Sequence, residues 1–191
     1  MVKRRSSEER VLSAALAIFN EAGVNAASIH DICDRAGVSI GSAYHHFESK
    51  KGIADALLIG GLRSNAQALA KRLSRVGGAE AGIRTVVESL VDWIEAHADW
   101  ARFIYTVSDA RAQTPELLKV NAEYGALIDA YFGPLIRAQE LRHMPRDMIT
   151  AVVVGPVHHL AKKILNDRPR PSLVPRKAHL ADAAWRAVRP D

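Results

Sequence analysis

The sequence predicts an all-α protein, with an N-terminal unit of three helices and a longer helical region after it, about nine helices in all. Three observations favour this class. Apolar residues recur at intervals of three and four along most of the chain, which places them on one side of a helix. Capping residues precede several of these segments, and glycines follow some of them. The run of three valines at residues 152–154 has helical flanks, so we expect it to lie within a helix.

The first predicted helix begins after Ser6, which can form a capping box with Glu9. Its apolar side repeats every three or four residues, as Leu12, Ala15, Phe19 and Ala22. Gly23 is expected to end it, because glycine readily adopts the backbone conformation found just beyond a helix.

The segment 28–51 predicts two short helices joined by a tight turn and the start of a third. Ser28, with Asp31 three residues later, is suited to cap the first of them. Gly37 suits the left-handed residue that ends it, and Ser39 is a good N-cap for the next.

That next helix, at residues 40–47, is composed mainly of small, polar or amphipathic residues. Only Ala43 and Phe47 suit sustained burial. A short helix with a polar outer side, placed after a glycine turn, is typical of a helix-turn-helix. The expected core of this three-helix unit is Leu12, Ala15, Phe19, Ile29, Ile32, Val38, Ala43 and Phe47.

The rest of the chain predicts longer helices. Their approximate ranges are 49–75, 80–97, 99–111, 115–136, 148–166 and 180–188. Gly60 and Gly61 lie inside the first of these, where each glycine costs roughly 0.5–1 kcal/mol relative to alanine. The pair therefore requires close packing or a bend. Pro134 and Pro156 are expected to kink the helices that contain them.

The net charge of +5 gives little support for nucleic-acid binding by itself. Residues 113–191 carry 12 basic and 8 acidic side chains, whereas residues 1–51 carry 7 and 6. The excess thus lies away from the helix-turn-helix. A DNA-binding function must rest on local residue types and spacing, including the short basic arm at residues 3–5.

Several other classes of protein are disfavoured. Cys33 is the only cysteine, which excludes a disulfide framework and a cysteine metal cluster. No run of about 18 apolar residues and no signal-type segment occurs, so we expect a cytoplasmic protein with no membrane partner. The C-terminal histidines lack the spacing to a carboxylate that a metal or hydrolase site needs. We therefore expect no catalytic residue, metal or cofactor.

The motifs at residues 36–39, 43–47 and 49–51, which read AGVS, AYHHF and SKK, resemble the tetracycline-repressor-like (TetR) transcription regulators. Their order and spacing match over about residues 7–57. Cys33, Ala43 and Lys51 depart from the usual residues, but none of these differences removes a group expected to contact DNA. The resemblance implies a homodimer, with a DNA-binding domain at residues 1–51 and an effector-binding and dimerisation domain at residues 52–191.

The resemblance also implies two sets of DNA contacts. The residues expected at base edges are His30, Ile40, Gly41 and Ser42. The residues expected at phosphates are Ser28, Ser39, Tyr44, His45 and Lys50. For Tyr44 the alternative is a packing residue that closes the three-helix core, and for His46 we favour that packing role.

Two further sets are predicted in the C-terminal region. The aromatic and polar residues expected to line an effector pocket are Trp93, His97, Trp100, Phe103, Asn121, Tyr124, Ile128 and Phe132. Aromatic residues at helical spacing can equally form packed core, and the resemblance favours a mostly apolar pocket. The residues expected at the dimer interface are Ala151, Val152, Gly155, His159, Leu180, Ala181, Ala184, Trp185 and Val188.

Together these features predict a ligand-responsive, dimeric transcriptional repressor that a small, largely apolar molecule releases from a palindromic DNA operator. An activator remains an alternative, as does a helix-turn-helix used for protein interaction without an effector. An enzyme using the C-terminal histidines is a third and weaker alternative.

Overall fold

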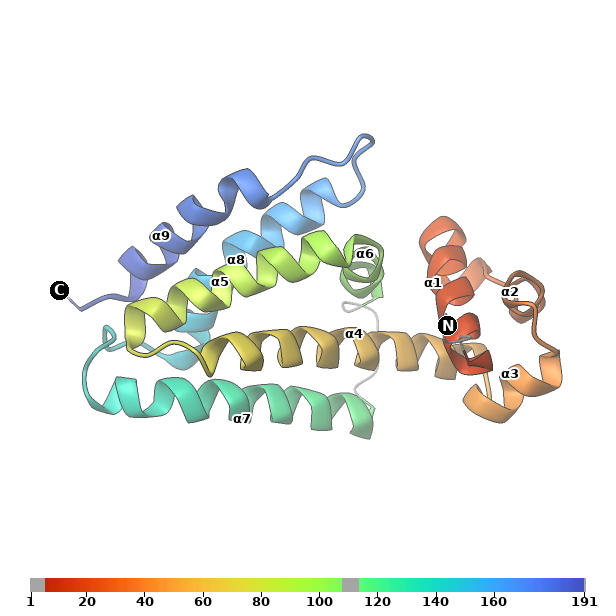
Figure 1. Ribbon diagram of the computed structural model, residues 1–191, viewed down its shortest axis with the longest axis horizontal. Coiled ribbons are helices and arrows are strands. Elements are labelled where there is room, and N and C mark those ends of the chain that lie inside the picture. The colour runs from red at the N-terminus through yellow and green to blue at the C-terminus, as the bar shows by residue number, and fades with distance from the viewer. Residues whose placement is uncertain (1–5, 108–113, 191) are drawn as a thin grey trace. The chain divides into compact units, whose positions relative to one another are not determined.

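Every regular element in the described part of the chain is a helix, which confirms the predicted all-α class (Figure 1). The computed structural model describes residues 6–107 and 114–190. Its α-helices are α1 (Ser7–Ala26), α2 (Ile29–Ala36), α3 (Ile40–Phe47), α4 (Lys50–Leu73), α5 (Ala79–Ala96), α6 (Ala98–Val107), α7 (Pro115–Arg137), α8 (Arg146–Ile164) and α9 (Lys177–Val188). A short 3-10 turn, η1 (Val174–Arg176), precedes α9.

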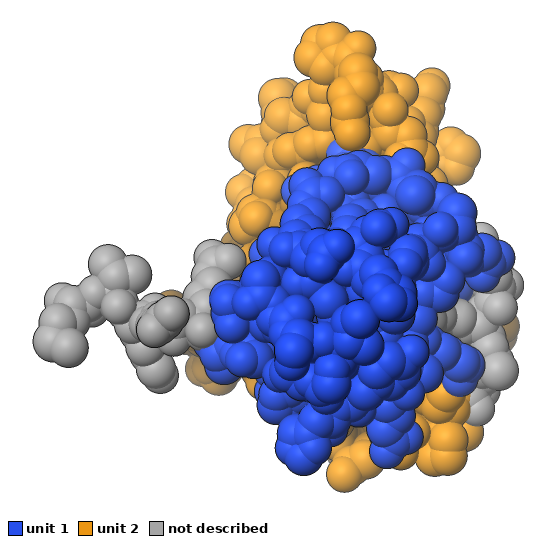
Figure 2. Space-filling model, turned by 90° about the vertical axis from the view of Figure 1, so that its right-hand side faces the viewer, with its two compact units in different colours: residues 1–61, 99–111 blue, residues 62–98, 112–191 orange. Residues whose placement is uncertain are grey.

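The chain forms two compact units, shown in different colours in Figure 2. The first unit takes residues 1–61 and 99–111, and the second takes residues 62–98 and 112–191. Helix α4 contributes its first half to one unit and its second half to the other. The predicted boundary after residue 51 does not follow these units; as a division of function it stays a prediction.

The first unit is built around the apolar sides of α1, α2 and α3. Five residues of the predicted core are buried: Ala15, Phe19, Ile32, Ala43 and Phe47. Three other predicted core residues are only half-buried: Leu12, Ile29 and Val38. The core also contains three buried residues outside the predicted set: Val11, Ile18 and Cys33. Helix α6 completes this core, because the Phe103 ring stacks on Phe19 with centroids 5.8 Å apart.

The glycine pair inside α4 is explained by close packing against α6. A Cβ at Gly61 would lie 2.6 Å from Cδ1 of Ile104 and 2.8 Å from Nε1 of Trp100. Such distances are too short for any side chain, so the missing Cβ lets the two helices approach. The indole of Trp100 also donates a hydrogen bond to the carbonyl of Leu57 (2.7 Å).

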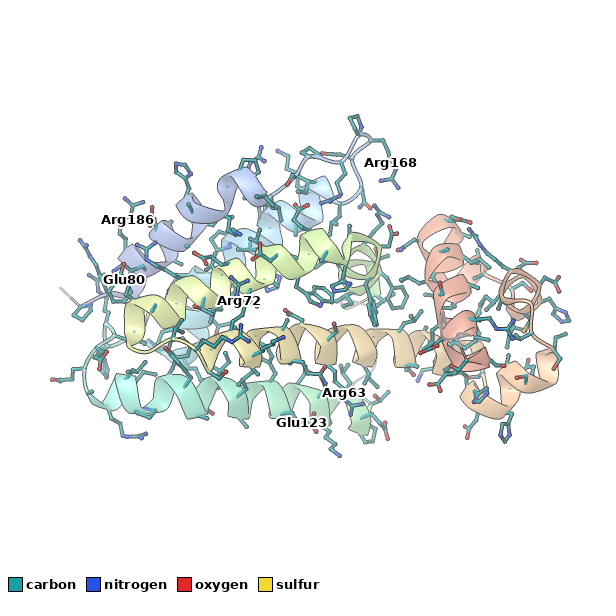
Figure 3. All side chains as sticks on the ribbon, in the orientation of Figure 1. Arg63, Arg72, Glu80, Glu123, Arg168 and Arg186 are labelled. Carbon is teal, nitrogen blue, oxygen red and sulfur yellow. The ribbon has the colours of Figure 1, made fainter. Side chains whose placement is uncertain are left out.

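In the second unit, α5, α8 and α9 pack against one another. Ala181, Ala184 and Val188 are the buried residues of α9. Charged pairs add to this packing: Asp92 of α5 accepts hydrogen bonds from Arg72 of α4 (2.7 Å) and Lys177 of α9 (2.8 Å). Figure 3 labels Arg72.

Candidate nucleic-acid interface and ligand cavity

Short-range capping fixes the geometry of the helix-turn-helix. The Ser28 hydroxyl accepts a hydrogen bond from the backbone N–H of His30 (3.1 Å), although no described contact completes a box with Asp31. Gly37 adopts the predicted left-handed conformation, with φ 62° and ψ 43°. The Ser39 hydroxyl then accepts from the backbone N–H of Ser42 (3.2 Å). Helix α3 therefore starts three residues after Gly37.

Helix α3 has a buried inner side and an exposed outer side. Ala43 and Phe47 are 0% and 8% exposed, as the sequence predicted. Ile40 and Tyr44 are 38% and 47% exposed, so both side chains can be reached by a partner. A Cβ at Gly41 would meet no atom within 4 Å, so open space surrounds the first turn. This side of α3 is therefore available to a partner.

The predicted base-edge residues lie on this exposed surface or beside it. His30, Ile40 and Gly41 are exposed, and Ser42 is half-buried. Nothing in their packing within the chain accounts for their residue types.

The predicted phosphate ligands differ in how free they are. Tyr44 and His45 are exposed. Ser28 and Ser39 accept the capping hydrogen bonds described above, which leaves each hydroxyl proton available to a phosphate oxygen. Lys50 is more constrained, because its ammonium donates to the carbonyls of Asn25 (2.8 Å) and Ala27 (2.7 Å). Lys50 therefore has a structural role at the end of α1, which the sequence did not indicate.

His46 does not close the core as favoured from the sequence. Its side chain is exposed, and its ring lies 5.5 Å from that of His45 and 6.0 Å from that of Phe47, between centroids.

The second unit contains a cavity of about 440 Å³, within the size range of ligand pockets. Helices α4, α5, α7 and α8 supply most of its wall. Most of the lining is apolar: Leu62, Ile83, Val86, Leu90, Val120, Ile128, Phe132, Ile136, Leu141, Met144, Ile149, Val153 and Val154. The polar lining residues are Asn65, Asn121, Tyr124, Asp129, Arg146, Thr150 and His158.

The structure brings together only half of the predicted effector set. Asn121, Tyr124, Ile128 and Phe132 line the cavity, and all four lie on α7.

The other four predicted pocket residues do not line it. Trp93 is buried and donates to the hydroxyl of Ser64 (3.1 Å). His97 is exposed at the end of α5, with its ring beside Trp93. Trp100 and Phe103 belong to the first unit, where they pack against α4 and α1. Helical spacing identifies the apolar side of a helix but does not say which neighbour that side meets.

Sequence reasoning missed the polar groups that α4 and α8 supply to the cavity. Arg146 donates to the carboxylate of Asp129 (2.8 Å) and to the carbonyl of Gly125 (3.2 Å). Burial lowers the pKa of His158, with a smaller contribution from the charge of Lys162. No local signal marks these residues, because each is a common type at an ordinary helix position.

The predicted dimer residues fall into two groups. On α8, Ala151 and His159 are exposed, Val152 and Gly155 are half-buried, and a Cβ at Gly155 would meet no atom within 4 Å. This side of α8 faces outward, since Val153, Val157 and Ala161 are the residues buried within the chain. It is available to a second subunit.

The α9 part of the predicted interface needs correction. Ala181, Ala184 and Val188 are 0%, 2% and 0% exposed in the single chain, because they pack within the second unit. They cannot also contact a partner. Leu180 and Trp185 remain partly accessible.

Within residues 6–107 and 114–190, no group of three or more His, Cys, Asp or Glu side chains is placed to hold a metal ion. Over the same ranges, no helix is both long and apolar enough to cross a membrane.

An exposed recognition helix on a capped helix-turn-helix, in an all-helical chain, is typical of DNA-binding transcription regulators. Residues 11–57 match the model of the bacterial regulatory proteins of the tetR family. The chain is 37% identical over 159 residues to the HTH-type transcriptional regulator UidR of Escherichia coli K12, covering 83% of this chain and 79% of UidR. The protein belongs to the tetR family, whose members are transcription regulators and not enzymes.

Two other similarities are informative. The HTH-type transcriptional repressor KstR2 of Mycobacterium tuberculosis is 46% identical over 55 residues, which is 29% of this chain and 28% of KstR2. The crystal structure of FadR from Bacillus subtilis, in complex with stearoyl-CoA, superposes with a TM-score of 0.79. It covers 92% of this chain and 96% of FadR at 13% identity, so this likeness concerns the fold alone.

Proposed function

We propose that this regulator acts as a homodimeric repressor that a small molecule releases from a palindromic operator. The observation that carries this proposal is the outer side of α3, where Ile40, Gly41 and Tyr44 are exposed beside open space. Similar relatives include both kinds of regulator: KstR2, which matches over 55 residues, is named a repressor, and FasR of Mycolicibacterium smegmatis, which is 29% identical over 161 residues, is named an activator.

The proposed readout of bases is modest. Ile40 can contact a thymine methyl, Gly41 allows the backbone to approach, and Ser42 can hydrogen-bond a base edge. None of these is the bidentate arginine or glutamine contact that dominates strong base recognition. Contacts to phosphate should therefore supply much of the affinity, so that binding weakens as the salt concentration rises.

The proposed effector site is the cavity of the second unit. Its apolar wall and few polar groups suit a small organic ligand. A protein of the same fold, FadR from Bacillus subtilis, has been crystallised in complex with stearoyl-CoA. Helix α4 takes part in both units, and its Leu62 and Asn65 line the cavity. A ligand that binds more tightly to one position of α4 than to another would change the fraction of the protein in the conformation that binds DNA.

The proposed dimer interface is the outward side of α8 around Gly155. Small residues there allow two helices to approach closely. A two-fold dimer presents two copies of α3, and the two must match half-sites about one helical turn of DNA apart. A palindromic operator follows from this symmetry.

Selection from a pool of random DNA duplexes would first identify the operator, and fluorescence anisotropy would then give the affinities. Tyr44→Phe should weaken every duplex by a similar factor, because the Tyr44 hydroxyl is assigned to phosphate. Ser42→Ala should change which duplex is preferred. If Ser42→Ala weakened all duplexes equally, or if no palindrome were selected, the assigned DNA contacts would be wrong.

Sedimentation velocity would test the dimer interface. Gly155→Arg should give monomers that still fold, since a Cβ at Gly155 meets no neighbour within the chain. Gly77→Arg is the matched control, because a Cβ at Gly77 also has open space but lies outside α8. Equal sedimentation of the two variants as dimers would exclude this side of α8 as the interface.

A further inference from the structure

The polar groups of the cavity are arranged in a way that restricts the charge of its ligand. Three helices supply them: α4 provides Asn65, α7 provides Asn121, Tyr124 and Asp129, and α8 provides Arg146, Thr150 and His158. The remaining wall is hydrocarbon, so any ligand buries most of its surface against apolar side chains. The charge and the hydrogen bonds of each polar group then decide which ligand head group can be buried there.

The positive charge at the cavity is already compensated. Among the lining residues that the structure describes, Arg146 is the one Arg or Lys side chain, and its guanidinium contacts the Asp129 carboxylate at 2.8 Å. A second N–H group of Arg146 donates to the Gly125 carbonyl. An anionic ligand would meet a guanidinium whose charge Asp129 already neutralises, and the Asp129 carboxylate would repel it.

His158 does not add a second positive charge to the cavity wall. Burial lowers the pKa of His158 below its ordinary value, and the nearby positive charge of Lys162 acts in the same direction. The imidazole is consequently neutral at neutral pH.

Three neutral groups of the lining have no hydrogen-bond partner among the described residues. They are the Tyr124 hydroxyl and the side-chain amides of Asn65 and Asn121. Burial raises the pKa of Tyr124, so its hydroxyl stays protonated. A phenol and a carboxamide each donate and accept hydrogen bonds. They complement an uncharged hydroxyl or carbonyl group, whose hydrogen bonds would offset the burial of all the groups involved.

We infer that the cavity selects uncharged, mainly hydrocarbon molecules that carry a hydroxyl or carbonyl group, and that it discriminates against carboxylates of the same size. The inference rests on the proposed role of the cavity as the effector site, and it adds the chemical class of the effector. Tyr124 hydrogen-bonds the polar group of the ligand, and the Arg146–Asp129 pair excludes the anion.

Equilibrium dialysis of the full chain against dodecanol and dodecanoate tests this inference, because the two probes share their hydrocarbon chain and differ in charge. At neutral pH, dodecanol should bind about tenfold more tightly or better. Dodecanoate binding as tightly as dodecanol would overturn the inference. Failure of both probes to bind saturably would overturn it as well.

Two variants separate the contribution of the Tyr124 hydroxyl from that of the Arg146–Asp129 pair. Tyr124→Phe should weaken dodecanol by about 3- to 10-fold, the range for one neutral hydrogen bond, and should leave binding of naphthalene, which has no polar group, unchanged. Asp129→Asn should strengthen dodecanoate by about tenfold, because Arg146 loses its competing anion. Unchanged dodecanol affinity in Tyr124→Phe, or unchanged dodecanoate affinity in Asp129→Asn, would contradict the assigned roles.

These measurements need no DNA, so they are independent of the regulatory proposal. If dodecanol binds with the expected preference but leaves operator affinity unchanged, the effector role fails and the ligand class stands. If another ligand releases the operator while dodecanoate outcompetes dodecanol, the effector role stands and the ligand class fails.

Discussion

Lys50 offers a direct test of how the helix-turn-helix is held together. In Lys50→Met the hydrocarbon stem is largely kept and the ammonium is lost. That ammonium donates to the carbonyls of Asn25 (2.8 Å) and Ala27 (2.7 Å), at the C-terminal end of α1. The variant therefore leaves two carbonyls at a helix end without a charged donor, near the loop that leads into α2.

The size of the loss follows from these two bonds. A hydrogen bond from a charged donor contributes about 1.5–3 kcal/mol. The bond to Asn25 is exposed and water can replace it, whereas the bond to Ala27 is partly buried. The bond to Asn25 should therefore contribute well under the full value. We expect a total loss of roughly 2–3 kcal/mol in the free energy of unfolding. This is a large share of the roughly 5–15 kcal/mol typical of a folded protein.

Urea unfolding measures this loss for the whole chain, and hydrogen exchange of the α1–α3 amides measures it in the first unit. Lys51→Met is the matched control, because its side chain is 66% exposed and its ion pair with Asp55, at 3.3 Å, lies within one helix turn. It should cost less than about 0.5 kcal/mol. Equal losses in the two variants would show that the bonds to Asn25 and Ala27 contribute little.

Two further predictions concern backbone packing and acid stability. Gly61→Ala should lower the free energy of unfolding by about 1–3 kcal/mol, because its Cβ would lie 2.6 Å from Ile104. Gly41→Ala has open space around it, so it should raise the free energy of unfolding by roughly 0.5–1 kcal/mol while weakening the binding of DNA. Thermal unfolding of the two variants measures both changes. Burial alone would raise the pKa of Glu95, but hydrogen bonds from the Arg170 side chain and a backbone N–H outweigh it and lower that pKa. Stability from Glu95 is thus full above its unfolded pKa, about 4.3, and is lost as the pH falls through the lower folded value. Glu95→Gln should accordingly destabilise the protein by roughly 1–3 kcal/mol at neutral pH and progressively less in acid, and a pH series of unfolding curves that stayed parallel would refute this.

The helix-turn-helix could be predicted closely because its signals are local. Ser39 caps α3 by bonding a backbone N–H three residues away, and Gly37 needs only its own backbone conformation. The alternation of buried Ala43 and Phe47 with exposed Tyr44 follows from helix geometry alone. Each of these features depends on a few consecutive residues, so the sequence contains all the information required.

The ligand cavity could be predicted only in part, because it depends on which helices meet. Phe103 and Phe132 both lie on apolar helix sides, yet Phe103 stacks on Phe19 in one unit while Phe132 lines the cavity in the other. Likewise, Val152 and Val153 are adjacent, but only Val153 is buried within the chain. Periodicity cannot decide between such neighbours, since the choice is made by packing between segments distant in the sequence.

Most of the excess positive charge of the protein lies in residues 113–191, away from the helix-turn-helix. Several cations of the C-terminal third are paired with acids of other helices: Lys177 with Asp92 at 2.8 Å, Arg170 with Glu95 at 2.9 Å, and Arg146 with Asp129. Such pairs connect segments of the unit and contribute little long-range field. Operator choice must then depend on the shape and hydrogen-bonding groups of α3, while contacts to phosphate supply much of the affinity. Alterations on the exposed side of α3 should for this reason change operator choice more than any change in net charge.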